Sequence, residues 1–583
     1  MTKTLLGSLR EYKKGSMLTI LLSVLEAAFE ILIPLRMADL IDQGIEPGEM
    51  AAVWKFGTII LVFAVLQLLT GVLSAHVAAK TSVGFSANLR QDMYDNVQTF
   101  AFSNIDKFST ASIVTRLTTD VTNLHNAYQM LIRMAVRGPV MLIFSMIVSF
   151  RINTTLALIF LAVIPIMAVL LLLIIRKVGP LFGRVFRTYD TLNNVVQENV
   201  RGIRVVKSFN QEDHEIKKFK GISQSIYEDF AAGERLLAFN SPIMQFFMYA
   251  CMILISWIGA KAIVASGNSA ALGMTTGDLT ALFSYATQIL MALMMLSMVF
   301  VMITISLASA HRIAEVLEEK TDIANPTGAE MTVRDGSIRF EHVNFSYAAK
   351  ADKKVLSDID LSIASGQTVG IIGGTGSSKS SLVQLIPRLY DVSSGRLLLG
   401  GVDVRKYDLE TLRSAVAMVL QKNELFSGTI KENLRWGNEA AGDEEMEEAC
   451  RLACADEFIQ GFPDKYDTYI EQGGSNVSGG QKQRLCIART LLKKPKVLIL
   501  DDSTSAVDTK TDAAIQKSLS TFIPDTTKLI IAQRVSSVQH ADLIIVMDEG
   551  KIVATGRHED LLKTCEIYRQ VYESQQKGDS DHE

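Results

Sequence analysis

Hydrophobic residues are concentrated in the first half of the chain, where long apolar runs alternate with polar segments. A helix that crosses a lipid bilayer needs about 20 mostly apolar residues. Runs of about that length lie at 17–41, 56–79, 131–150, 154–175, 241–265 and 279–308. The pattern therefore predicts an α-helical membrane domain with six spans.

The placement of Lys and Arg between these runs predicts the orientation of the spans, because basic residues favour cytoplasmic loops. They are frequent at 80–137 and 176–235, whereas 42–50 and 266–277 contain none. We expect a multi-pass protein of the cell membrane with both termini and the two long loops in the cytoplasm. Loops of this length need structure of their own, and both have a helical pattern. Their tips, near 104–110 and 209–212, are candidates for docking on the soluble domain.

Two features inside the predicted spans leave alternatives open. Glu26 and Glu30 lie one helical turn apart at membrane depth, where a carboxylate is costly. They either attract a cationic substrate or have a protonated or hydrogen-bonded packing role. Methionines recur at helical spacing in the sixth span, and they either line a cavity for varied ligands or pack against other helices. These are Met291, Met294, Met295, Met298 and Met302.

The second half has the composition of a soluble α/β domain. A chain of 583 residues is too long for one core at about 100–200 residues per domain. We predict a membrane domain with long cytoplasmic helical extensions at 1–320, a linker at 321–335, an α/β domain at 336–573 and a disordered tail at 574–583. The net charge of −4 gives no argument for nucleic acid, and the five cysteines show no metal or disulfide spacing.

A glycine-rich loop stands between a predicted strand and a predicted helix, and it reads Gly-Gly-Thr-Gly-Ser-Ser-Lys-Ser from Gly373 to Ser380. In such P-loops the backbone N–H groups hold phosphates, the Lys reaches the β- and γ-phosphates, and the last hydroxyl binds Mg²⁺. The domain is therefore predicted to bind ATP and Mg²⁺. The strict pattern has Gly at position 378, so Ser378 is accommodated only if its backbone avoids angles that favour Gly. The expected ligands are Gly373, Gly374, Thr375, Gly376, Ser377, Ser378, Lys379, Ser380 and Ser381.

Three further positions fit the same nucleotide. Tyr347 follows a predicted strand at 337–345, and its ring can stack on adenine. Gln421 follows a predicted strand at 415–420 and can contact Mg²⁺ or a water molecule. Asp501 ends the apolar strand 496–501, where a carboxylate is suited to Mg²⁺.

The segment Asn476–Arg484 points to a second phosphate contact. Its Gly-Gly pair before a predicted helix gives bare backbone donors at a positive helix end. The donors are expected at Ser478, Gly479, Gly480 and Gln481. This segment lies about a hundred residues from the P-loop, so we expect it to contact a nucleotide held by another subunit.

This order of motifs after six spans resembles an ABC exporter half-transporter, and the resemblance covers essentially the whole chain. It implies a transport-coupled ABC ATPase that works as a domain-swapped dimer. Each ATP site would join one chain's P-loop to the other chain's signature segment, here Ser478–Gln481. Ser505–Asp508 would be the D-loop, and the two cytoplasmic tips would be coupling helices.

Two catalytic positions depart from the family pattern. Asp502 stands where the family carries a catalytic Glu, and Gln533 stands where it carries a switch His; Gln421 is the third residue expected near the reacting phosphate. The pairing resembles the degenerate-site subunit of bacterial heterodimeric multidrug ABC exporters. It implies a second half-transporter with an intact Glu and His as partner, and an amphipathic or drug-like substrate.

Other interpretations remain open. The chain is alternatively a lipid or peptide exporter, a homodimeric exporter with tolerated site variants, or a regulatory subunit that moves no substrate itself. The six spans argue against a soluble ABC ATPase. The fusion of spans and ATPase in one chain disfavours import.

Overall fold

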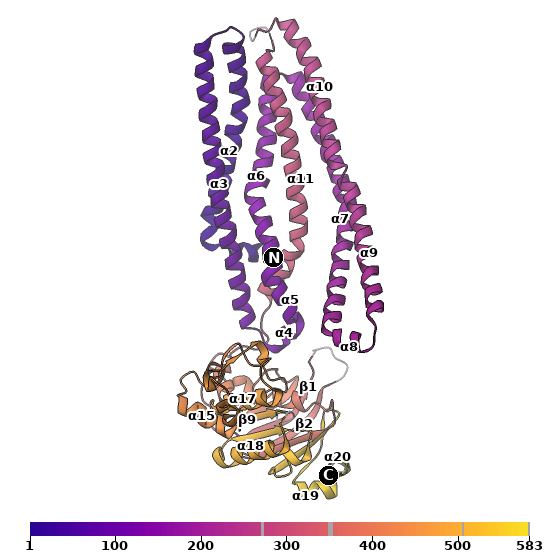
Figure 1. Ribbon diagram of the computed structural model, residues 1–583. Helices are drawn as coiled ribbons and strands as arrows, with labels where there is room; N and C mark the ends of the chain where they lie inside the picture. Colours follow the sequence, from indigo (N-terminus) through magenta and orange to yellow (C-terminus); the bar gives the residue numbers. More distant parts are fainter. Residues whose placement is uncertain (270–272, 348–353, 504–506, 581–583) are drawn as a thin grey trace. The chain divides into compact units, whose positions relative to one another are not determined.

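The computed structural model describes residues 1–269, 273–347, 354–503 and 507–580 (Figure 1). The chain divides into two compact units. Unit 1 comprises Met1–Gln98 and Thr110–Glu319, and unit 2 comprises Thr99–Ser109 and Lys320–Glu583. A short segment of the first long loop therefore groups with the second half of the chain.

Unit 1 is built from long helices, and six helical stretches are long and apolar enough to cross a membrane. The prediction of six spans is confirmed. The helices are α1 (Thr2–Gly7), α2 (Lys13–Leu40), α3 (Met50–Gln98), α5 (Thr110–Thr115), α6 (Val121–Ile152), α7 (Thr154–Arg201), α8 (Ile203–Ser208), α9 (Glu212–Leu237), α10 (Asn240–Ser266) and α11 (Thr276–Glu318).

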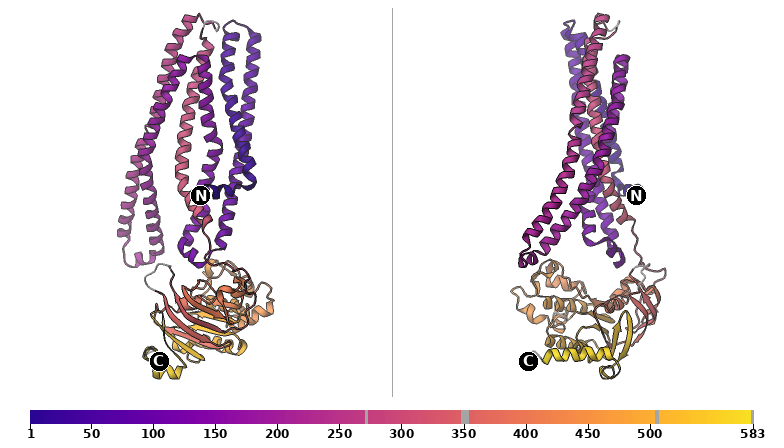
Figure 2. Two further views of the ribbon diagram at one scale, coloured as in Figure 1. Left: turned by 180° about the vertical axis from the view of Figure 1, so that it is seen from behind. Right: turned by 90° about the vertical axis from the view of Figure 1, so that its right-hand side faces the viewer.

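Several of these helices continue well beyond their apolar runs. α3 has 49 residues, although the apolar run predicted only 56–79. α7 and α9 run side by side to the short helix α8 and diverge from α6 and α11 on the way (Figures 1 and 2). The extensions are helical because they contain few helix-breaking residues, which hydropathy alone does not detect.

The two carboxylates at membrane depth share one guanidinium group. Arg137 on α6 donates from Nη1 to Glu26 Oε1 at 2.9 Å and from Nη2 to Glu30 Oε2. The Glu26 side chain is only 8% exposed. Of the two alternatives for these residues, this pairing favours the structural role.

The methionines of the sixth predicted span lie on α11. Met291, Met294 and Met298 are 63%, 44% and 65% exposed. Packing within this chain therefore does not account for these three side chains, and cavity lining remains a prediction.

Unit 2 contains two main sheets. The larger sheet has the order β12-β11-β3-β10-β9-β6, in which only β12 is antiparallel to its neighbour. The smaller antiparallel sheet has the order β2-β1-β4-β5, and β7 pairs with β8. The strands are β1 (Ile338–Phe345), β2 (Leu356–Ile363), β3 (Thr368–Gly373), β4 (Ser394–Leu399), β5 (Val402–Asp403), β6 (Val416–Val419), β7 (Gly428–Thr429), β8 (Tyr469–Ile470), β9 (Val497–Asp501), β10 (Thr527–Ile531), β11 (Leu543–Asp548) and β12 (Lys551–Gly556).

Burial explains why these strands form a central parallel sheet. Every residue of β9 and β10 is buried, as expected for strands covered on both faces. Alternate residues enter different cores, since Leu498 and Leu500 belong to one hydrophobic cluster and Val497 and Ile499 to the other. The predicted combination of a helical membrane domain and an α/β P-loop domain is confirmed.

Short helices surround the sheets of unit 2. They are α4 (Phe102–Phe108), α12 (Lys379–Gln384), α13 (Leu409–Ala415), α14 (Ile430–Arg435), α15 (Asp443–Leu452), α16 (Asp456–Gln460), α17 (Gly479–Leu491), α18 (Thr509–Phe522), α19 (His558–Thr564) and α20 (Glu566–Ser580). Residues 574–580 were expected to belong to a disordered tail, but they continue α20 as helix. One reason is that Gln575 is hydrogen bonded to the backbone of the β10–β11 loop.

The first predicted tip forms α4, which packs within unit 2. The Tyr390 hydroxyl donates to Asp106 Oδ2 at 2.8 Å, and the Tyr390 ring lies 6.0 Å from that of Phe102. Burial and the bond to Asp106 both raise the pKa of Tyr390. Asn104 donates to the Lys320 carbonyl at 3.1 Å.

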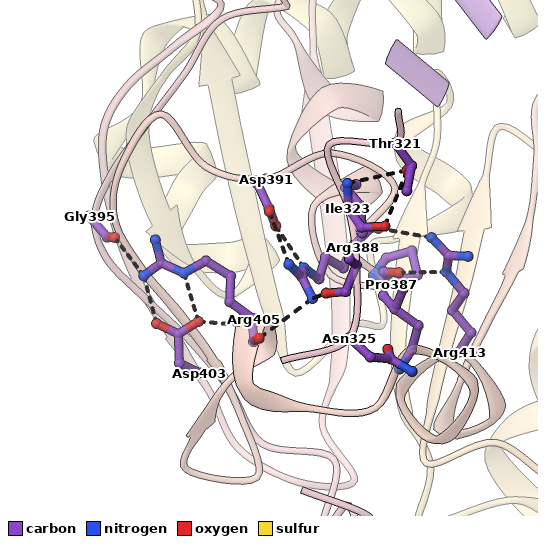
Figure 3. A network of polar contacts seen from close by, with 12 residues as sticks. Thr321, Ile323, Asn325, Pro387, Arg388, Asp391, Gly395, Asp403, Arg405 and Arg413 are labelled. Carbon is purple, nitrogen blue, oxygen red and sulfur yellow. Dashed lines mark hydrogen bonds and ion pairs between the residues drawn. The ribbon is translucent and has the colours of Figure 1, made fainter. Parts of the chain in front are cut away.

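A network of arginines holds the start of the predicted linker (Figure 3). Arg388 is buried, pairs with Asp391 at 2.8 Å and donates to the Ala324 carbonyl at 3.3 Å. Arg413 donates to the Arg388 carbonyl at 3.2 Å. The linker and the segment that carries Tyr390 are thus fixed to one another.

Candidate active site

The glycine-rich loop leaves β3 at its carboxyl end and enters α12. β3 lies inside the parallel sheet, with β10 and β11 as neighbours. Gly373 is required by close packing, because an added Cβ would lie 2.2 Å from the Met547 carbonyl oxygen. The loop opens on a cleft of about 530 Å³ that includes Gly373, Gly374, Thr375, Gly376, Ser378, Lys379, Ser380 and Ser381.

Lys379 is held at the mouth of the loop. Its Nζ donates to the carbonyl oxygens of Gly373 and Gly374, each at 2.9 Å, and to Ser377 Oγ at 3.2 Å. Burial lowers the pKa of Lys379, while Asp502 and Asp501 oppose that shift. A partly desolvated ammonium group in this place is suited to bind phosphate oxygens strongly.

Ser378 adopts backbone angles that favour glycine, contrary to the expectation that its backbone would avoid them. Its φ is +71° and its ψ is 22°, in the left-handed region. That conformation costs a residue with a Cβ roughly 1–2 kcal/mol. The P-loop therefore keeps its shape at an energetic cost at this position.

We expect Ser378→Gly to stabilise unit 2 by about 1 kcal/mol, because glycine adopts positive φ without strain. The midpoint of its thermal unfolding in the full chain should rise by about 2–4 °C. Ser377→Gly is the matched control, since Ser377 is not among the residues with positive φ. An unchanged or lower midpoint for Ser378→Gly would contradict the assignment of strain.

Hard oxygen ligands meet beside Lys379. The Ser380 hydroxyl donates to Asp501 Oδ1 at 2.9 Å. Burial raises the pKa of Asp501, the neighbouring charge of Asp502 adds to that shift, and the Ser380 bond opposes it. A hydroxyl, a carboxylate and the nearby Gln421 amide fit Mg²⁺, which takes oxygen ligands and completes its shell with phosphate and water.

The three predicted catalytic positions come together in the same cleft. Gln533 Nε2 donates to Asp502 Oδ2 at 2.7 Å, and Gln421 Nε2 lies 3.5 Å from the same oxygen. Burial raises the pKa of Asp502, while the bonds from Gln533 and Gln421 and the charge of Lys379 oppose the shift. Two neutral amides therefore contact the carboxylate oxygen that a catalytic base would use.

The predicted adenine contact lies next to the P-loop helix. The Tyr347 hydroxyl is 2.8 Å from Ser381 Oγ, and the side chain is half exposed. Its ring packs edge-on against Tyr390 at 5.0 Å. A half-exposed aromatic ring beside the P-loop is suited to stacking.

The segment Ser478–Gln481 begins α17. Ser478 caps the helix, accepting from the Gln481 N–H, and Gln481 Oε1 accepts from the Ser478 N–H at 2.9 Å. Ser478 and Gly479 are exposed. Among the described residues, the lining of the P-loop cleft does not include this segment.

α20 also contributes to the site, which the sequence did not predict. Val571 lines the cleft with Lys379 and Asp502, and Gln575 contacts the loop that carries Gln533. Neither residue belongs to a local sequence motif that would predict this role. Ser505 and Ala506 of the predicted D-loop lie outside the described residues.

ABC-type ATPases combine a parallel sheet, a P-loop and a second phosphate-binding segment at the start of a helix, here α17. Comparison with known protein families gives the same assignment. Residues 356–505 match the family described as "ABC transporter", and residues 16–294 match "ABC transporter transmembrane region". The chain belongs to the ABC transporter family. It combines a six-helix membrane domain with an ATP-binding ABC ATPase coupled to transport, and as a half-transporter it requires a second half.

Similar proteins span the same length. The chain is 37% identical to the uncharacterized ABC transporter ATP-binding protein YfiB of Bacillus subtilis (strain 168) over 573 residues, with 98% of each chain covered. It is 35% identical to the uncharacterized ABC transporter ATP-binding protein Rv1273c of Mycobacterium tuberculosis (H37Rv), with 97% of each covered. Its fold matches a bacterial Atm1-family ABC exporter with ATP bound, at a TM-score of 0.83 and 23% identity, covering 97% of this chain and 99% of that one.

Proposed function

We propose that this chain is the degenerate-site half of a heterodimeric exporter in the cell membrane, with both termini in the cytoplasm. Its own site binds ATP and Mg²⁺ but hydrolyses ATP slowly. The observation that carries this proposal is the 2.7 Å hydrogen bond from Gln533 to Asp502 in the P-loop cleft. The resemblance to ABC exporters implies His and Glu at these two positions.

The chemistry of the two side chains explains slow hydrolysis. Aspartate is one methylene shorter than glutamate, so its carboxylate stands farther from an attacking water. Displacement of a general base by about 1 Å costs on the order of 100-fold in rate. Gln533 donates to Asp502 but has no titratable group, so it lacks the positive charge of an imidazolium.

Two observations on this chain support the proposal that it works with a partner. The signature segment Ser478–Gln481 is intact and absent from the described lining of its own cleft. At the second tip, Val205 and Phe209 are 61% and 72% exposed. An apolar tip of this kind fits a docking surface on a second half-transporter.

Exposed methionines of the membrane domain support the proposed class of substrate. Met291, Met294 and Met298 present flexible apolar side chains that pack within this chain only in part. Such side chains adapt to ligands of varied shape, which favours amphipathic or drug-like molecules over one specific ligand. Export of lipids or peptides, and a homodimeric exporter with tolerated variants, are the alternatives.

ATP hydrolysis measured on the purified full chain, alone and with a half-transporter encoded beside it, tests the proposal. We expect the chain alone to be nearly inactive and the pair to be active, with substrate stimulation of the paired ATPase. Brisk hydrolysis by the lone chain as a homodimer would favour tolerated variants instead. An active pair without substrate stimulation would favour a regulatory subunit.

A further inference from the structure

The C-terminal helix α20 holds the backbone of the loop that carries Gln533. The Gln575 side chain donates from Nε2 to the Gln533 carbonyl oxygen at 2.8 Å. Its Oε1 accepts from the Val535 N–H, also at 2.8 Å. The side-chain amide of Gln575 therefore bonds to the carbonyl before Arg534 and to the N–H after it. A neighbouring β-strand would satisfy the same two backbone groups.

The helix that carries Gln575 is anchored in the hydrophobic core of unit 2. The Tyr568 side chain of α20 is fully buried, and its hydroxyl lies 2.7 Å from His558 Nδ1. Cys565 is buried, and Val571 and Tyr572 pack against the same hydrophobic core as α17 and α18. A side chain that projects from an anchored helix is preorganised for its contact.

The loop that α20 holds leads directly to the phosphate site. Gln533 receives the Gln575 bond on its carbonyl group and donates from its own side chain to Asp502. Val535 is 1% exposed, which fixes the other end of the contact. A shift of the loop backbone therefore moves the Gln533 amide relative to Asp502 and Lys379.

We propose that Gln575 is a positioning residue that fixes this loop and keeps the Gln533 amide at the phosphate site, so that α20 slows ATP release from this chain's own site. The proposal rests on the ATP binding proposed above for this chain's own site. It does not depend on the rate at which Asp502 supports hydrolysis, because the release of unhydrolysed ATP competes with hydrolysis and does not require it.

Hydrogen exchange and nucleotide release on the full-length chain in nanodiscs test this role. In Gln575→Ala, the amide of Val535 should exchange about tenfold faster, because one of the two bonds that hold the loop is its own. A fluorescent ATP analogue should leave several-fold faster. Gln576→Ala is the matched control, since Gln576 donates to Tyr572 within α20, and both readouts should stay as in the unaltered chain.

A second variant separates positioning from local structure. Gln575→Glu keeps an acceptor for the Val535 N–H but replaces the donor to the Gln533 carbonyl with an oxygen. We expect Val535 to stay protected while the ATP analogue is released as fast as from Gln575→Ala. Unchanged release in both variants would overturn the proposal. Faster exchange throughout α20 and β10 would also overturn it, since Gln575 would then be a structural residue only.

These readouts are independent of the degenerate-site proposal. If the lone chain hydrolyses ATP rapidly, that proposal fails, yet release of a non-hydrolysable fluorescent analogue still reports on Gln575. Slow hydrolysis combined with unaltered release in Gln575→Ala would instead leave the degenerate site in place and remove the role of α20.

Discussion

The double substitution Asp502→Glu and Gln533→His is expected to raise ATP turnover at this chain's own site about 100-fold, because general-base action contributes 10²–10⁴-fold. The longer carboxylate reaches farther toward the attacking water. The imidazole removes the amide that donates to Asp502 at 2.7 Å and supplies a group that can carry charge. Phosphate release is measured on the pair after the partner's own P-loop lysine has been replaced, so that only this chain's site contributes.

The controls for this experiment are built into the chain. Adding Lys379→Ala to the double variant should abolish the gained turnover, which would locate it at this P-loop. Each single substitution should recover only part of the gain, since Asp502 and Gln533 are in direct contact and such pairs are not additive. A double variant no faster than the unaltered chain would show that Asp502 and Gln533 do not limit hydrolysis.

The candidate site could be predicted as a set of motifs but not as a set of contacts. The P-loop is local in sequence, so its spacing alone predicted its ligands. The contact of Gln533 with Asp502 depends on the parallel pairing of β9 with β10, which places Ile531 opposite Asp501. The contact of Gln575 could not be predicted from the sequence, because a polar residue near a terminus belongs to no pattern that indicates a tertiary contact.

In the membrane domain, too, local patterns could be predicted from the sequence and tertiary contacts could not. Apolar runs predicted the six spans, and the helical pattern of the long loops predicted the polar extensions that α3, α7 and α9 form. Arg137 was counted among the cytoplasmic basic residues that predicted the orientation. The structure pairs it with Glu26 and Glu30 instead, a contact between α2 and α6 that no spacing along the chain reports.

This pairing leads to the second large expected effect. Arg137→Leu should destabilise unit 1 by about 3–5 kcal/mol, because it leaves the buried carboxylate of Glu26 and the partly buried one of Glu30 without a counter-charge. Glu26 is the critical group, since its Oε2 already lacks a hydrogen-bond partner within the part of the chain that the structure describes. Thermal unfolding in detergent and the yield of folded chain are the measurements. Arg133→Leu, one helical turn away on α6, is the matched control and should have a smaller effect.

A rescue experiment identifies the cause. Adding Glu26→Gln and Glu30→Gln to Arg137→Leu removes both uncompensated charges, and the neutral amides cost far less at membrane depth than carboxylates. The triple variant should therefore regain most of the lost stability, although Glu26→Gln and Glu30→Gln remove favourable pairs when Arg137 is present. If the triple variant is as unstable as Arg137→Leu, lost packing of the Arg137 side chain is responsible. If it recovers stability but the pair no longer transports amphipathic cations, the two carboxylates also contribute to substrate binding.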